Sequence, residues 1–162
     1  IPAGPITMNT LYTVFPFGNS ISVVKVTGAQ LLEALEASCS AAPSALGGFP
    51  QVSGIRFTID TAVPYVNGMQ YPDSTYYAPA VPGSRVTIET VGGRAFDPAD
   101  SYYIAVNNFM ADGGDTYYVF TQAEEVIDTG VIDAEGLISY VDSLGGVIGQ
   151  EYALPKGNIT IK

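Results

Sequence analysis

Apolar residues recur at helical spacing in the stretch that follows Thr27, and this pattern predicts a well-defined helix there. Its start carries a capping-box pattern, because Gln30 follows Thr27 by three residues. Glu33 and Glu36 are expected on the solvent side of this helix. Its predicted buried face consists of Leu31, Leu32, Leu35 and Cys39.

A second amphipathic stretch predicts a helix over residues 133–144. Asp133 is expected as its N-cap, and Gly145-Gly146 is expected to end it. The apolar face of this helix would be formed by Leu137, Ile138, Val141 and Leu144. A shorter helix is predicted between Thr7, as its N-cap, and Pro16.

Strands are predicted where β-branched or alternating apolar residues gather, over residues 21–26, 54–60, 101–108 and 157–162. A hairpin is predicted over residues 85–96, because the two-residue turn Gly92-Gly93 suits type I′ geometry. Residues 41–54 are expected to form a loop, and residues 61–84 a long excursion without regular structure. Helices and strands mix without a βαβ rhythm, which predicts one α+β domain, with mixed sheets and flanking helices, over residues 1–162.

The charge balance narrows the possible partners. The net charge is −10, and the six Lys and Arg residues are scattered, so we expect no binding to nucleic acid. No apolar run approaches the ~18 residues of a membrane span, and the first ten residues do not resemble a signal peptide. The chain opens on Ile, which suggests a mature segment or an excised domain. Low Lys content with many Tyr residues is typical of an exported protein.

Few residues of this chain are suited to metal binding or acid–base chemistry. The sequence contains no His, which removes the commonest metal ligand and general base. Its one cysteine, Cys39, lies on the apolar face of the first predicted helix. We therefore expect Cys39 to be a buried structural thiol and not a nucleophile.

The stretch NNFMADGGDTYY, residues 107–118, is a candidate site because an aromatic residue precedes two glycines and a carboxylate. An EF-hand loop is excluded: Asp112 and Asp115 are three positions apart, and the twelfth position from Asp112 is Ala123 where Glu is needed. A phosphate-binding loop is excluded as well, since the Lys of a P-loop is missing and no helical pattern follows the glycines.

The interpretation that remains is a site for a flat polar ligand. Phe109 would offer a stacking face, worth about 1–3 kcal/mol per base. Asp115 would accept two hydroxyl hydrogen bonds from a ribose, and Gly113 and Gly114 would keep the approach open. The alternative is a tight turn in which Phe109 is a core residue, and the residues alone leave both interpretations open.

Two further stretches are weaker candidates. In VFPFGNS, residues 14–20, Phe15 precedes a proline, so its ring is expected to face away from that of Phe17. In GGFPQVSGIRFTID, residues 47–60, glycines bracket a turn that leads into a strand, and Arg56 is expected to point outward. Glu124-Glu125 is interpreted as part of a solvated face.

Four motifs occur in order along the chain: PFGN, TG-x-x-L-x-x-x-L-E, QVSG and NNFMADGGDTY. Together they resemble the C-terminal substrate-binding domain of the 5′-nucleotidase family, from about residue 4 to about residue 120. The resemblance implies that Phe17 and Phe109 clamp a purine and that Asp115 binds the ribose. The other substrate-binding candidates within these motifs are Asn19, Asn108, Gly113 and Gly114.

The resemblance also implies what lies outside this chain. The family pairs this domain with an N-terminal metallophosphoesterase domain in cis, which would hold two divalent metal ions, so no cofactor is expected in this chain. The chain alone would bind a nucleotide or nucleoside and would not be catalytic, and the parent protein would be secreted, periplasmic or cell-wall associated. The alternatives are a non-catalytic surface module and part of a hydrolase for 2′,3′-cyclic nucleotides or nucleotide sugars. Thr116 departs from the family pattern, where many members carry Gly.

Overall fold

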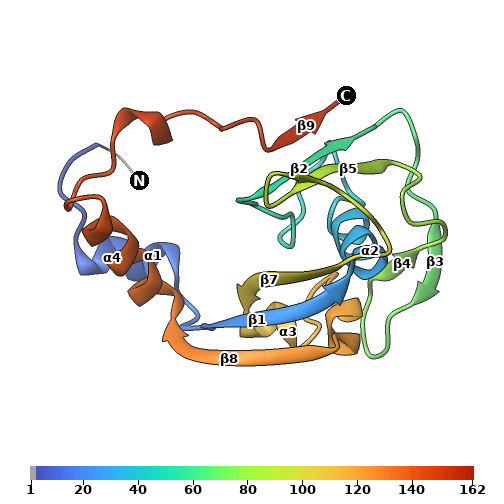
Figure 1. Ribbon diagram of the computed structural model, residues 1–162, viewed down its shortest axis with the longest axis horizontal. Helices are drawn as coiled ribbons and strands as arrows, with labels where there is room; N and C mark the ends of the chain where they lie inside the picture. Colours follow the sequence, from blue (N-terminus) through green and yellow to red (C-terminus); the bar gives the residue numbers. More distant parts are fainter. Residues whose placement is uncertain (1–2) are drawn as a thin grey trace.

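Three sheets organise the chain in the computed structural model, which describes residues 3–162 (Figure 1). The strand orders are β7-β1-β8, β6-β5-β2-β9 and β3-β4. The strands are β1 (Ser20–Thr27), β2 (Ile55–Ile59), β3 (Asn67–Gln70), β4 (Tyr77–Pro79), β5 (Val86–Val91), β6 (Arg94–Ala95), β7 (Ser101–Asn107), β8 (Glu125–Ile132) and β9 (Ile159–Ile161). The helices are α1 (Met8–Val14), α2 (Gly28–Ser38), α3 (Asn108–Ala111) and α4 (Asp133–Ser143), with 3₁₀ turns η1 (Tyr118–Gln122) and η2 (Gln150–Tyr152). The α+β prediction is confirmed.

Helix α2 holds the sheets together, because it contacts β1, β5 and β4. Its capping box is present as predicted: the Thr27 side chain accepts a hydrogen bond from the backbone of Gln30, and the Gln30 side chain accepts one from the backbone of Thr27. Leu31, Leu35 and Cys39 belong to one buried cluster with side chains of β1, β2 and β5. The buried position of Cys39 confirms the prediction of a structural thiol.

The prediction that Glu36 faces solvent is wrong. Its side chain is fully buried and accepts hydrogen bonds from the backbone of Gly83, from Ser84 Oγ at 2.6 Å and from Arg85 N at 3.3 Å. Glu33 also lies less exposed than predicted: it is half-buried, and Tyr71 donates a hydrogen bond to it at 3.2 Å. The chain that covers both carboxylates comes from residues 61–84, a contact that helical spacing does not reveal.

Residues 61–84 are also more regular than predicted, since β3 and β4 form a two-stranded sheet there. A second correction concerns β8, which pairs with β1 and was not predicted as a strand. A third concerns α4, whose N-cap is Ile132; Asp133 is the first helical residue, and its carboxylate accepts a hydrogen bond from Ala134 N at 2.7 Å.

Two further local predictions agree with the structure. Thr7 caps α1. The turn between β5 and β6 has φ of +59° at Gly92 and +77° at Gly93, as a type I′ turn requires. The chain after α4 passes across the molecule to β9, which pairs in parallel with β2 (Figure 1). Within residues 3–162, no helix combines the length and apolarity that crossing a membrane requires.

Candidate functional site

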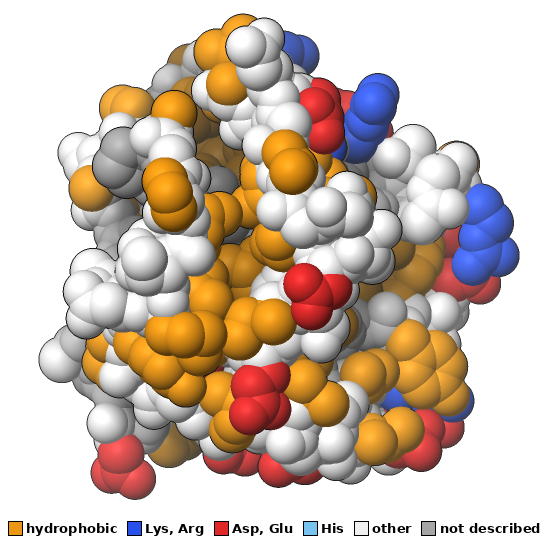
Figure 2. Space-filling view, turned by 90° about the vertical axis from the view of Figure 1, so that its left-hand side faces the viewer, with side chains coloured by type: hydrophobic (Ala, Val, Ile, Leu, Met, Phe, Trp, Pro, Cys, Tyr) orange, Lys and Arg blue, Asp and Glu red, His pale blue; other side chains and the backbone are white. Residues whose placement is uncertain are grey.

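A cavity of about 790 Å³ opens between the sheet that contains β7 and the sheet that contains β2 and β5. Hydrophobic side chains gather inside this hollow (Figure 2). Its deep walls come from β7, β2, β5 and α2, and its rim comes from the three stretches that the sequence singled out. The residues that matter below are Phe17, Asn19, Gly48, Phe49, Gln51, Val52, Asn107, Phe109, Asp115 and Tyr117, all of which line it.

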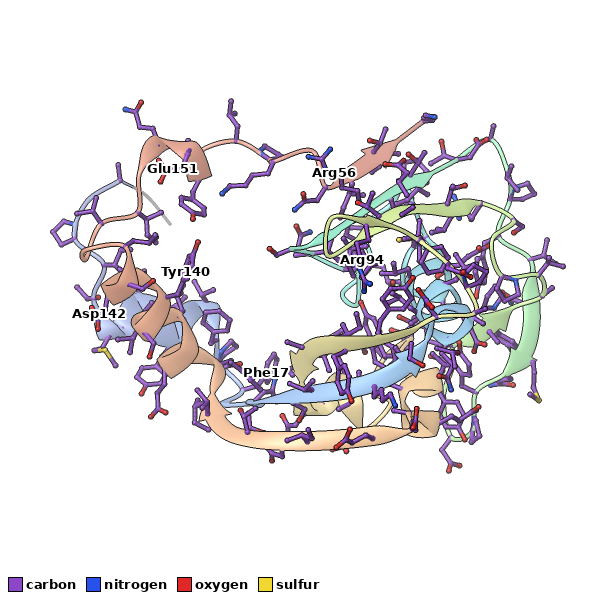
Figure 3. All side chains as sticks on the ribbon, in the orientation of Figure 1. Phe17, Arg56, Arg94, Tyr140, Asp142 and Glu151 are labelled. Atoms are coloured by element: carbon purple, nitrogen blue, oxygen red, sulfur yellow. The ribbon has the colours of Figure 1, made fainter. Side chains whose placement is uncertain are left out.

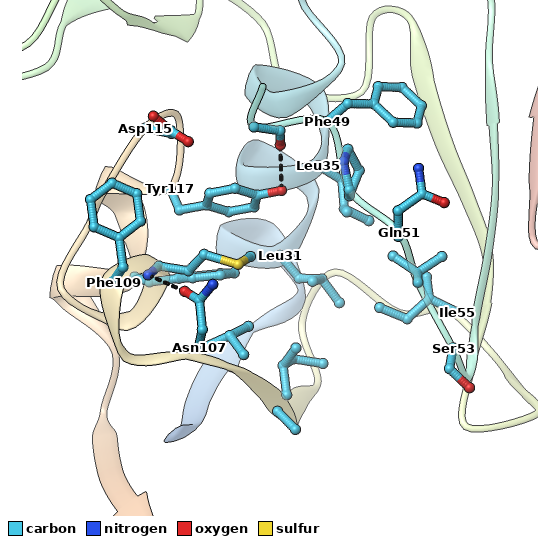
Figure 4. Close-up of a pocket in the computed structure, with 18 of the residues that line it drawn as sticks. Leu31, Leu35, Phe49, Gln51, Ser53, Ile55, Asn107, Phe109, Asp115 and Tyr117 are labelled. Carbon is cyan, nitrogen blue, oxygen red and sulfur yellow. Dashed lines mark hydrogen bonds between the residues drawn. The ribbon is translucent and has the colours of Figure 1, made fainter. Parts of the chain in front are cut away.

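Phe109 lies in the short helix α3, which begins directly after β7. Asn107 caps this helix, and its Oδ1 accepts a hydrogen bond from Met110 N at 2.8 Å. The Phe109 ring is 49% exposed and stands at the cavity wall (Figure 4). The alternative in which Phe109 is a core residue is therefore wrong.

Asp115 lies on the same wall as Phe109, in a backbone conformation that is unusual for a side-chain-bearing residue. Its φ is +50°, which Asp and Asn tolerate better than most residues. Gly113 has φ of +84°, and a Cβ there would lie 2.6 Å from Thr121 Cγ2. Neither Gly113 nor Gly114 lines the cavity. Gly113 packs against Thr121 and Gly114 against the Phe109 ring, so both shape the loop that carries Phe109 and Asp115.

The PFGN turn brings Phe17 and Asn19 to the same cavity. Phe17 is 84% exposed, whereas Phe15 is partly buried. Figure 3 shows Phe17 beside the start of β1, away from the exposed Arg56. Asn108 is not part of the wall: its Oδ1 accepts a hydrogen bond from Ser20 N at 3.2 Å and so ties α3 to β1.

Sequence reasoning missed Tyr117 and the part that residues 47–52 play. Tyr117 is buried, lines the cavity and donates a hydrogen bond to the carbonyl of Gly48 at 2.8 Å (Figure 4). Burial raises the pKa of Tyr117 to about 12, so its hydroxyl remains a donor at neutral pH. The glycines made residues 47–54 part of a candidate stretch, but no local sequence pattern links this stretch to Tyr117.

The charge in the cavity is negative. Asp115 is the acidic residue that lines it, and no Lys or Arg of the described chain does so. Among residues 3–162 there is also no cluster of three or more His, Cys, Asp and Glu side chains that could hold a metal ion. The cavity therefore suits an uncharged group with a flat face and hydroxyls, and the donor set does not fit a dinuclear metal centre.

The chain is an α+β domain with a cavity between two of its sheets. Residues 1–122 match the family described as "5′-nucleotidase, C-terminal domain". The chain belongs to this family, as the order of its motifs predicted.

Individual relatives support the same assignment. The chain is 36% identical over 153 residues to the trifunctional nucleotide phosphoesterase protein YfkN of Bacillus subtilis, covering 91% of this chain and 9% of that protein. It is 30% identical to Protein 5NUC of Lutzomyia longipalpis, covering 98% of this chain and 26% of that protein. The crystal structure of the 5′-nucleotidase precursor from Thermus thermophilus superposes with a TM-score of 0.78 and 34% identity, over 99% of this chain and 29% of that one. The chain thus spans about a quarter or less of the two curated relatives.

Proposed function

We propose that this chain is the nucleotide-recognition domain of a 5′-nucleotidase-like phosphoester hydrolase and that it binds the base and ribose of the substrate. One observation carries the proposal. Phe17 lies far from Phe109 and Asp115 in the sequence, and the fold brings all three to the wall of one cavity. Two exposed aromatic rings and a carboxylate match the three needs of a nucleoside, which are two stacking faces for the base and an acceptor for ribose hydroxyls.

The charge in the cavity decides which part of a nucleotide it holds. A phosphate group would lie beside Asp115 without a Lys or Arg in the lining, in a chain of net charge −10. That arrangement is unfavourable for an anion. The base and ribose carry no such charge, so the nucleoside part occupies this cavity and the phosphate points out of it.

The chemistry belongs to a metallophosphoesterase domain in cis. Two divalent metal ions bound there would activate water and stabilise the displaced phosphate. Phe17, Phe109 and Asp115 would contribute binding energy away from the reacting phosphate, and this energy would position it. The low Lys content supports a location outside the cytoplasm, and the relative from Thermus thermophilus is described as a precursor.

The test is a comparison of two substrates of the full-length protein with added divalent metal. Phe17→Ala and Phe109→Ala should each lower kcat/KM for AMP by about tenfold to a hundredfold, the equivalent of one stacking contact. Hydrolysis of p-nitrophenyl phosphate, which lacks base and ribose, should be nearly unchanged. Tyr12→Ala is the matched control, because Tyr12 is an exposed aromatic residue on α1 that does not line the cavity.

Two outcomes would contradict the proposal. An equal loss for AMP and for p-nitrophenyl phosphate would show that the two rings do not act through the base. A full-length protein that hydrolyses neither ester with any divalent metal would favour the alternative of a non-catalytic binding module.

A further inference from the structure

Tyr117 joins two segments of the cavity wall that are far apart in the sequence. Its hydroxyl donates to the carbonyl of Gly48 at 2.8 Å across a separation of 69 residues. Its ring packs on that of Phe120, with centroids 5.6 Å apart and planes inclined by 27°. Phe120 is itself fully buried in the core cluster. The hydrogen bond to Gly48 therefore starts from a side chain that cannot move freely.

Gly48 lies directly against Asp115. A Cβ built on Gly48 would be 3.2 Å from Asp115 Cβ and 3.4 Å from Asp115 Oδ2. Real Cβ atoms seldom lie as near as 3.2 Å to such a neighbour. The segment that contains Gly48 thus packs on the carboxylate side chain with no space between them, and any displacement of the segment changes the surroundings of the carboxylate.

Residues 47–52 form the wall that faces Phe109 across the cavity (Figure 4). Phe49, Gln51 and Val52 of this segment line the cavity. The end of the segment is fixed separately, because Asn158 Nδ2 donates to Val52 O at 2.8 Å. Tyr117 supplies the bond that ties the beginning of the segment to the loop that carries Phe109 and Asp115.

We propose that Tyr117 is a positioning residue for the nucleoside, because its hydroxyl fixes residues 47–52, which form the wall of the binding cavity that faces Phe109. The inference rests on the proposed function. Without the hydroxyl, the buried carbonyl of Gly48 loses its donor and the segment must move to satisfy it. The wall then moves relative to Phe109 and Asp115, and the bound nucleoside loses contacts with residues 47–52.

The test is a calorimetric titration of the full-length protein with adenosine. Tyr117→Phe removes the hydroxyl and keeps the ring, and should raise the Kd for adenosine about three- to tenfold. Tyr102→Phe is the matched control, since Tyr102 is also buried, exchanges hydrogen bonds with the backbone of Asp97 through its hydroxyl, and does not line the cavity. Tyr102→Phe should leave the Kd unchanged even if it lowers the thermal stability.

A second variant displaces the same segment by another route. Gly48→Ala keeps the hydroxyl of Tyr117 but places a methyl group against Asp115, so it should raise the Kd as well. If both changes act through the position of one segment, the Kd of the double variant should not exceed that of the single variant with the higher Kd. Fully additive losses would mean that Tyr117 does not act through Gly48 and would overturn the inference. If Tyr117→Phe proves unfolded at the temperature of the titration, an unchanged Kd in Gly48→Ala would overturn the inference, because residues 47–52 would then not need a fixed position to bind the nucleoside.

Different experimental results would overturn the positioning role of Tyr117 and the proposed function. A wild-type protein that binds adenosine, with an unchanged Kd in Tyr117→Phe, overturns the positioning role and leaves the proposed function standing. A wild-type protein that does not bind adenosine, together with unchanged AMP kinetics in Phe109→Ala, overturns the proposed function and the inference with it.

Discussion

The Phe109 ring lies directly on the backbone of Gly114. A Cβ on Gly114 would come within 2.4–2.6 Å of three carbons of the ring, and Gly114 N donates a hydrogen bond to Phe109 O at 2.8 Å. The absence of a side chain at Gly114 therefore allows the Phe109 ring its present orientation, and this is a more direct effect than any on a ligand. Any side chain at position 114 must push the ring out of its present orientation.

Gly114→Ala should consequently abolish stacking without removing the ring. The Kd for adenosine should rise by the same factor as in Phe109→Ala, and p-nitrophenyl phosphate hydrolysis should change little. The double variant Phe109→Ala/Gly114→Ala is the control, because the added methyl group then has no ring to displace and should cause no further loss. A clear further loss in the double variant, measured by titration calorimetry, would show that Gly114 acts on something other than Phe109.

Under the proposed function, Asp115 binds the ribose and not the base. Asp115→Asn keeps the shape of the side chain and tolerates the φ of +50°, so the free energy of unfolding should change by less than about 0.5 kcal/mol. The Kd for adenosine should rise because the amide accepts hydroxyl hydrogen bonds less strongly than the carboxylate. The Kd for free adenine should stay the same. Equal weakening for adenosine and adenine would contradict a role of Asp115 on the ribose.

Glu36 is predicted to be one of the most important polar residues for stability. It is fully buried and accepts hydrogen bonds from the residues Gly83, Ser84 and Arg85. Glu36→Ala removes the acceptor of all three donors, of which Arg85 is buried, and leaves a cavity at a fully buried position, so it should lower the free energy of unfolding in urea by about 2–5 kcal/mol. Glu135→Ala, at an exposed position of α4, should cost less than about 1 kcal/mol. Similar losses in the two variants would contradict the structural role of Glu36.

Local sequence patterns were sufficient where the structure depends on neighbours in the chain. The capping box at Thr27, the N-cap at Thr7 and the Gly92-Gly93 turn all form as predicted. Strand β8 could not be predicted in this way, because nearly all of its side chains are exposed and show no alternation. Its strand conformation follows from pairing with β1, which is a tertiary contact.

At the candidate site, too, sequence motifs were sufficient for some residues, whereas tertiary contacts were not predicted. Motif order led to Phe17, Phe109 and Asp115, which meet at one cavity. The contact between Tyr117 and Gly48 spans 69 residues, and neither residue has a spacing that predicts it. Glu36 was misplaced for a related reason: helical periodicity put it on the polar face, but residues 83–85 cover that part of the face.

Glu33 gives the stability a predictable dependence on pH. Burial raises the pKa of Glu33, although the hydrogen bond from Tyr71 partly opposes the shift. A carboxyl group with a raised pKa in the folded state favours folding when it is protonated. Its contribution is therefore full below the pKa of the unfolded chain, falls as the pH rises towards the raised pKa of the folded chain, and stays lost above it.

Glu33→Gln should remove this dependence, because Gln keeps an acceptor for Tyr71 and carries no charge. Urea unfolding between pH 4 and pH 8 should show the variant gaining stability relative to wild type as the pH rises, with no further gain once Glu33 is ionised in the folded protein. Glu135→Gln is the control at an exposed position and should not alter the relative pH profile in this way. A parallel pH profile for Glu33→Gln and wild type would contradict the raised pKa.

Cys39 provides a direct probe of the core. The thiol is fully buried, and burial raises its pKa to about 12, so almost no reactive thiolate is present at pH 8. Native protein should resist labelling by dithionitrobenzoate, whereas protein unfolded in urea should react stoichiometrically. Glu36→Ala should speed labelling under native conditions, because the thiol becomes accessible each time the less stable core opens. Stoichiometric labelling of the native wild-type protein within seconds would show that Cys39 is accessible and that α2 does not close the core over it.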